Sequence, residues 1–141
     1  SIGGCAALET CLVSDRCKAG INLDGFHPRQ IGKGPEKAPF LFLFREGHLL
    51  YGTHLDAASA PAHAAVVSGV THFNFFDFAL MSPLYKRMGV LGELDGRVAL
   101  DTNARVALAF FDAYLKNGGR PVWPDLPHVA FTDKPSSAGT P

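Results

Sequence analysis

Residues 39–44 read Pro-Phe-Leu-Phe-Leu-Phe, and this stretch decides the fold class. A short, continuous apolar run without alternating polar residues is typical of a strand that is buried on both faces of a parallel sheet. The polar residues Arg45-Glu46-Gly47-His48 end the run. Two further strands of this kind are predicted at residues 19–23 and 64–70, one before and one after it in the sequence.

Helices are predicted before the first of these strands and after the last. Residues 3–13 are good helix formers with apolar residues at helical spacing. The longest predicted helix covers residues 97–116, with Asp95 as its N-cap and Gly118-Gly119 at its end. The face of this helix that is expected to be buried carries Ala104, Leu108, Phe111 and Leu115.

Strand and helix alternate along the chain, and the predicted strands are too apolar to face water. This pattern predicts an α/β fold in which parallel strands are flanked by helices on both faces. Short helices or loops are also expected near residues 53–58 and 81–88. We assign residues 1–117 to one α/β domain and residues 118–141 to a tail rich in Pro, Ser and Thr, with one strand-like piece at residues 129–131.

The composition argues against several classes of protein. Thirteen basic residues balance thirteen acidic ones, which is not typical of a nucleic-acid-binding protein or of a polybasic membrane anchor. No apolar run approaches the roughly 20 residues of a membrane-spanning helix. Cys5, Cys11 and Cys17 are expected to be buried or free thiols; the alternative, a Cys11–Cys17 bridge at a helix end, would indicate an oxidising, secreted or periplasmic setting.

Polar side chains stand where the carboxyl ends of the predicted strands are expected. Asp24 follows the first strand, Glu46 the second and His72 the third. Ser1-Ile2-Gly3-Gly4, directly before a helix, is typical of the second half of a nucleophile elbow, the turn that exposes a serine hydroxyl. Because ligands bind outside the carboxyl ends of parallel strands, these positions predict an active site.

A serine hydroxyl becomes a nucleophile when a base takes its proton and a carboxylate orients that base. The chain order of serine, carboxylate and histidine is that of the α/β-hydrolases. His72 is the candidate base because it directly follows the third strand. Asp24 and Glu46 compete for the place of the acid, although Asp24-Gly25 is also a common turn pair. The remaining histidines are expected in loops or the tail: His27, His48, His54, His63 and His128.

Two further sets of side chains have both a structural and a functional interpretation. The aromatic residues of 73–78 are expected to belong to the core, with an acyl pocket or a lipid contact as the alternative. His48, His54, Asp56 and His63 lack the spacing of a familiar zinc site, so no metal is expected.

Three blocks of the sequence stand together as a pattern: residues 1–4 (Ser-Ile-Gly-Gly), 20–25 (Gly-Ile-Asn-Leu-Asp-Gly) and 69–78 (Gly-Val-Thr-His-Phe-Asn-Phe-Phe-Asp-Phe). In order and spacing they resemble the platelet-activating factor acetylhydrolase family of α/β-hydrolases, which includes plasma, type II and bacterial lipase-like enzymes. The resemblance extends to about residue 115. Its most specific block is the histidine with aromatic residues and Asp-Phe behind it.

The resemblance implies that Ser1 is the nucleophile, Asp24 the acid and His72 the base, and it therefore favours Asp24 over Glu46. It also implies that the amide of Ile2 is one donor of the oxyanion hole, with the second in a loop upstream of the elbow. The central strands of the fold are then expected upstream of Ser1. The present chain is expected to form the C-terminal part of an α/β-hydrolase, with the strand before Ser1 pairing with residues 19–23.

The resemblance further implies a serine carboxylic ester hydrolase that acts on short acyl esters or lipids through an acyl-enzyme, without metal or cofactor. Residues 26–29 (Phe-His-Pro-Arg) differ from the aromatic segment of the plasma enzyme, so a general short-chain esterase is an alternative. A related serine peptidase and a non-catalytic fragment that only binds stay open. The expected partners are a small ester or lipid, a peripheral lipid surface and the upstream half of the same domain, and not nucleic acid.

Overall fold

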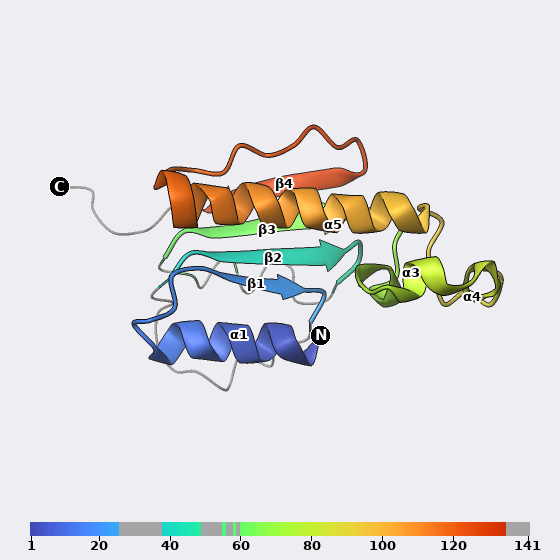
Figure 1. Ribbon diagram of the computed structural model, residues 1–141, viewed down its shortest axis with the longest axis horizontal. Helices are drawn as coiled ribbons and strands as arrows, with labels where there is room; N and C mark the ends of the chain where they lie inside the picture. The colour runs from blue at the N-terminus through green and yellow to red at the C-terminus, as the bar shows by residue number, and fades with distance from the viewer. Residues whose placement is uncertain (26–37, 49–54, 56–57, 59, 135–141) are drawn as a thin grey trace.

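The computed structural model describes residues 1–25, 38–48, 55, 58 and 60–134. Its centre is a four-stranded sheet in the order β1-β2-β3-β4 (Figure 1). The strands are β1 (Gly20–Leu23), β2 (Phe40–Arg45), β3 (Ala62–Val67) and β4 (Val129–Lys134). The short helix or loop predicted near residues 53–58 falls almost wholly outside the described residues.

The first three strands are parallel, as the sequence predicted. The third strand ends earlier than expected, at Val67, because Gly69 takes a left-handed conformation with φ of 72° that turns the chain out of the sheet. The strand-like piece predicted at residues 129–131 is part of β4, which pairs antiparallel with β3. The fold is therefore a mixed, mostly parallel sheet flanked by helices.

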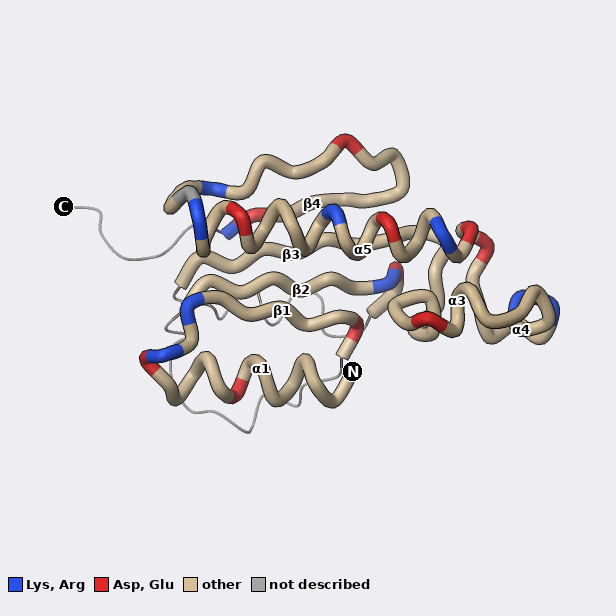
Figure 2. Tube along the Cα trace, in the orientation of Figure 1, with Lys and Arg blue, Asp and Glu red and all other residues tan. Residues whose placement is uncertain are grey.

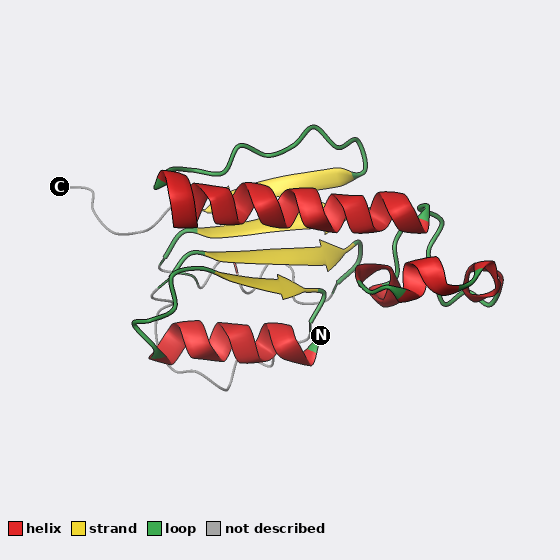
Figure 3. Ribbon diagram, viewed as in Figure 1, coloured by secondary structure: helices red, strands yellow, loops and turns green. Residues whose placement is uncertain are grey.

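β2 is buried on both faces, which explains its unbroken apolar sequence. Phe40, Phe42 and Phe44 pack on one face against Leu8 and Cys11 of helix α1 (Ile2–Val13). Leu41 and Leu43 pack on the other face against helix α5 (Gly96–Phe111). Successive side chains of a strand point to opposite faces, so one strand serves both layers. Figure 3 shows these two helices on either side of the sheet.

The buried face of α5 differs from the predicted one. The residues buried are Ala99, Thr102, Val106 and Phe110. Leu108 is 57% exposed and Leu115 55%, so the face predicted through Ala104, Leu108, Phe111 and Leu115 is wrong, although Phe111 is partly buried. A polar residue shifts the pattern: the Thr102 hydroxyl lies 2.8 Å from the Val98 carbonyl oxygen and 2.6 Å from His128 Nε2, and these contacts allow it to be buried.

The ends of α5 agree with the sequence. The carboxylate of Asp95 accepts hydrogen bonds from the backbone N–H groups of Arg97 and Val98, as expected of an N-cap. A π-helical turn at residues 112–117 continues the helix, and Gly118, with φ of 63°, ends it.

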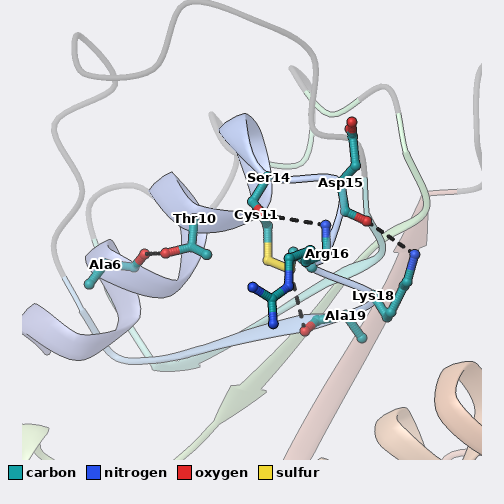
Figure 4. The surroundings of a disulfide bond; sticks show 9 residues. Ala6, Thr10, Cys11, Ser14, Asp15, Arg16, Lys18 and Ala19 are labelled. Atoms are coloured by element: carbon teal, nitrogen blue, oxygen red, sulfur yellow. Dashed lines mark hydrogen bonds between the residues drawn. A yellow bond between two sulfur atoms is a disulfide. The ribbon is translucent and has the colours of Figure 1, made fainter.

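Cys11 and Cys17 are joined by a disulfide, so the expectation of unpaired thiols was wrong for this pair (Figure 4). Their Cα atoms lie 5.0 Å apart. The six-residue separation spans the turn from α1 into β1, and Lys18 Nζ donates a hydrogen bond to the Asp15 carbonyl oxygen in the same turn. Cys5 takes no part in a disulfide with the described residues.

His63 was predicted in a loop but is the second residue of β3, and it is buried. Its Nδ1 lies 2.7 Å from Asp133 Oδ1 on β4, and its Nε2 lies 2.6 Å from the hydroxyl of Tyr114. Burial raises the pKa of Tyr114, and the charge of Asp133 adds to this, while Arg120 opposes it. The cluster fastens β4 and the turn after α5 to β3.

We predict that the buried and exposed faces of α5 respond differently to truncation. Val106→Ala removes two methyl groups from the core and should lower the free energy of unfolding by about 2 kcal/mol. Leu108→Ala removes more atoms from an exposed site and should change it by less than about 0.5 kcal/mol. Urea unfolding followed by circular dichroism measures both. A larger loss for Leu108→Ala would contradict the packing described for α5.

Candidate active site

The parallel strands end at one edge of the sheet, and polar residues gather there. In Figure 2 the three parallel strands are free of charged residues along most of their length, and a charged residue stands at the tips of β1 and β2. Asp24 follows β1, Arg45 ends β2, and His72 begins a short 3₁₀ helix, His72–Phe75, after β3. The N-terminus lies beside the tip of β1, where the Ser1 α-amine donates a hydrogen bond of 2.8 Å to the Leu23 carbonyl oxygen (Figure 1).

Asp24 and His72 are in direct contact. His72 Nδ1 lies 2.8 Å from Asp24 Oδ2. The Asp24 side chain is 2% exposed, whereas that of His72 is 33% exposed. A buried carboxylate that holds Nδ1 orients the ring and leaves Nε2 as the second nitrogen. This is the arrangement that a catalytic histidine and its acid require.

The turn after β1 positions the Asp24 carboxylate toward His72. Asp24 has a left-handed backbone with φ of 47°, and its N–H donates to the Leu43 carbonyl oxygen at 2.8 Å. The fully buried Asn22 closes the turn, because its Oδ1 accepts from the Gly25 N–H at 2.8 Å and its Nδ2 donates to the Gly25 carbonyl oxygen at 3.2 Å. The strained conformation is thus held by neighbouring hydrogen bonds.

Arg45 contacts both oxygens of Asp24, a role that sequence reasoning missed. Its backbone N–H donates to Asp24 Oδ1 at 3.0 Å, and its Nε lies 3.3 Å from Oδ2. The sequence signal for it was weak: Arg45 opens the polar stretch that ends the predicted strand, a place where any polar residue fits.

A second buried asparagine supports the turn that carries His72. Asn74 Oδ1 accepts hydrogen bonds of 2.9 Å from the N–H groups of Thr71 and Gly92. The Thr71 hydroxyl lies 2.6 Å from the Val90 carbonyl oxygen. These bonds tie the turn to the segment that leads into α5, so the position of His72 is set from two sides.

Ser1 occupies the N-cap position of α1, but its side chain makes no cap hydrogen bond to the helix. Among the described residues, hydrogen bonds join His72 to Asp24 and the Ser1 α-amine to Leu23, and none joins Ser1 Oγ to His72. Burial lowers the pKa of the Ser1 α-amine, while the thiol of Cys5 and the carboxylate of Asp24 act to raise it. Ser1 and Asp24 therefore lie close enough to interact electrostatically.

Two glycines let the start of α1 lie against the Asp24 turn. A Cβ on Gly4 would fall 2.1 Å from Asn22 Oδ1, and one on Gly25 would fall 2.4 Å from the Ser1 carbonyl oxygen. Neither position can carry a side chain without a shift of buried groups. The close approach places Ser1 beside the turn that carries Asp24.

The alternative acid, Glu46, is exposed, and its backbone N–H donates to the Val67 carbonyl oxygen. The carboxylate that lies within hydrogen-bond distance of His72 Nδ1 is that of Asp24 and not that of Glu46. His48 lies nearby and stacks on Phe44 with ring centroids 4.1 Å apart. Burial lowers the pKa of His48, with Arg45 and His72 acting in the same direction and Asp24 against it.

The aromatic residues after His72 are only in part core. Phe75 is buried, whereas Phe73, Phe76 and Phe78 are exposed by about 40% each. The Phe76 ring lies edge-on to His72 at 5.2 Å between centroids. A cavity of about 340 Å³ lies farther along, between α3 (Phe78–Met81), α4 (Pro83–Arg87) and the start of α5, and neither Asp24 nor His72 lines it. The candidate site is therefore the hydrogen-bonded pair of His72 and Asp24, since these two side chains can move and hold a proton.

Among the residues that the structure describes, no group of three or more His, Cys, Asp or Glu could hold a metal ion. His54 and Asp56 of the rejected zinc set lie outside those residues. His48 follows the carboxyl end of β2 and His63 lies near the start of β3, which is the opposite end of the sheet. In the described part of the chain, no helix is long and apolar enough to cross a membrane.

A mostly parallel sheet with helices on both faces is the architecture of the α/β-hydrolases, and the Asp24–His72 contact lies at the carboxyl ends of its strands. The family model for platelet-activating factor acetylhydrolase, isoform II, matches residues 1–120. The chain belongs to this family of lipase- and esterase-like hydrolases. A search of curated proteins found no match.

We predict that Gly4 and Gly3 differ sharply in their tolerance of a methyl group. Gly4→Ala should lower the free energy of unfolding by more than about 1 kcal/mol, because the new Cβ would collide with buried Asn22. Gly3→Ala meets nothing within 4 Å and should leave stability unchanged or raise it by up to about 1 kcal/mol, since Ala favours a helix. Chemical denaturation measures both variants. Equal stabilities would show that the start of α1 does not pack on the Asp24 turn.

Proposed function

We propose that this protein is a serine carboxylic ester hydrolase that acts on short acyl esters or lipids. The observation that carries the proposal is the contact between His72 Nδ1 and the buried Asp24 carboxylate, at the strand ends where Ser1 also lies. Membership in the acetylhydrolase family supports it. The proposed roles are Ser1 as nucleophile, His72 as general base and Asp24 as the group that orients it.

The reaction would follow the two-step course of serine hydrolases. His72 Nε2 takes the proton of the Ser1 hydroxyl as Oγ attacks the ester carbonyl, and Asp24 stabilises the imidazolium that forms. The N–H of Ile2 donates to the oxyanion of the tetrahedral intermediate. His72 returns the proton to the leaving alcohol, and a water molecule then cleaves the acyl-enzyme by the same route. No step requires a metal or a cofactor.

The substrate side of the proposal depends on the aromatic residues near His72. Phe73 and Phe76 form edge-on contacts with the His72 ring and are both partly exposed. They could therefore contact the acyl chain of a bound ester, or a lipid surface from which the ester is taken. The upstream half of the domain would supply the second oxyanion donor. Peptide substrates and mere ligand binding are the competing functions.

Covalent labelling and two substitutions test this proposal. A fluorophosphonate should label Ser1 and not the Ser1→Ala variant. His72→Ala and Asp24→Asn should each lower p-nitrophenyl acetate turnover by about 10⁴-fold, since the first removes the base and the second favours the wrong imidazole tautomer. The matched control is Asp101→Asn on the exposed surface of α5, which should leave turnover unchanged.

These experiments are to be done on the full-length protein that contains this chain. Near-normal turnover in either site variant, with Ser1 intact, would overturn the triad. Labelling of Ser1 with hydrolysis of peptides in preference to esters would favour the peptidase alternative. The absence of labelling would favour a protein that only binds.

A further inference from the structure

The carboxylate of Asp24 contacts two residues, His72 and Arg45, and the proposed function gives no role to Arg45. Oδ2 lies 2.8 Å from His72 Nδ1 and 3.3 Å from Arg45 Nε, while Oδ1 accepts the Arg45 backbone N–H at 3.0 Å. Arg45 therefore contacts both oxygens, and His72 contacts one. Two points of attachment on one residue fix both the position and the rotation of a carboxylate.

The two attachments differ in kind. The backbone N–H belongs to the last residue of β2, so it is as rigid as the sheet. The side chain of Arg45 is 43% exposed, and its guanidinium lies against the carboxylate of Asp24, whose side chain is only 2% exposed. The backbone contact sets where Oδ1 lies, and the side chain brings a positive charge to the oxygen that also binds His72.

We propose that Arg45 is a positioning residue for this site, which holds the Asp24 carboxylate toward His72 and moderates its negative charge through the guanidinium. This inference rests on the proposed function. It assigns to Arg45 no contact with substrate. Its effect on catalysis is exerted through Asp24 and His72 alone.

The charges around His72 fix the sign of the electrostatic effect. The groups that face it or its acid are Asp24 after β1, Arg45 and His48 after β2, and the α-amine of Ser1 before α1. Glu46 is exposed. The guanidinium of Arg45 brings a positive charge to the Asp24 carboxylate. Because a positive charge opposes the uptake of a proton by the site, loss of the Arg45 charge should move the acidic limb of activity to higher pH.

The test uses Arg45→Met, which removes the charge but keeps an unbranched side chain, and Arg45→Lys, which keeps the charge but loses the planar fork. The matched control is Arg105→Met, since Arg105 is 47% exposed and pairs with Asp101 on the surface of α5. Each variant is compared with the wild type in the full-length protein for kcat and KM between pH 4 and 9. Nitrogen-edited NMR follows the His72 ring over the same range.

In Arg45→Met we expect kcat to fall by about tenfold with little change in KM, because the acid is less well oriented. The acidic limb of kcat/KM should move to higher pH, because the site loses a positive charge, and the NMR signals of the His72 ring nitrogens should change. Arg45→Lys should restore the acidic limb but only part of kcat. Arg105→Met should match the wild type in both.

The outcomes separate this inference from the proposed function. If neither the wild type nor any variant hydrolyses esters, the proposed function fails, and the His72 ring signals in Arg45→Met still decide whether Arg45 acts on the pair. Unchanged ring signals overturn the inference, whether kcat falls or not, because a fall in kcat without them reports only a structural loss. A change of the same size in Arg105→Met also overturns it, since the effect would then not be local.

Discussion

The burial of β2 on both faces is the constraint on which the rest of the structure depends. Alternate side chains of one short strand contact α1 on one side and α5 on the other, so this strand holds the two helical layers at a fixed spacing. It also pairs in parallel with both β1 and β3. Because β1, β2 and β3 run in the same direction, their carboxyl ends meet at one edge, and that edge becomes the site.

At that edge, two buried asparagines stabilise the turns that follow β1 and β3 through hydrogen bonds to backbone groups. Asn22 closes the turn of Asp24, and Asn74 closes the turn of His72. Each amide satisfies backbone groups that leave the sheet and would otherwise be buried without partners. The pair that results is held by the fold and does not depend on a mobile loop. Arg45 adds the third support, because its own backbone ends the central strand.

A contact between a histidine and an aspartate occurs twice among the described residues, with different consequences. His63 contacts Asp133 as closely as His72 contacts Asp24, yet His63 is buried and both of its ring nitrogens are engaged. A histidine with no nitrogen left to exchange a proton fastens elements together. His72 is one-third exposed and is held at Nδ1, which leaves Nε2 for chemistry. Burial and hydrogen bonding, more than the presence of a carboxylate, separate a structural histidine from a candidate base.

Local patterns of apolar, capping and turn residues were enough to predict the three parallel strands, the N-cap of α5 and the strand-end positions of Asp24 and His72. The antiparallel pairing of β4 with β3 and the contacts at the site depend on the folded chain. The contact of His72 with Asp24, which the family resemblance already favoured over Glu46, depends on which turn faces His72, and the second contact of Arg45 depends on the spacing of neighbouring strands. The buried face of α5 could not be predicted from the pattern of apolar residues, because it includes the polar Thr102. The hydroxyl of Thr102 can be buried only because Val98 and His128 provide hydrogen-bond partners in the folded chain. The Cys11–Cys17 bridge requires that the turn from α1 into β1 bring the two Cα atoms to 5.0 Å from each other. The spacing of the two cysteines in the sequence does not specify that distance.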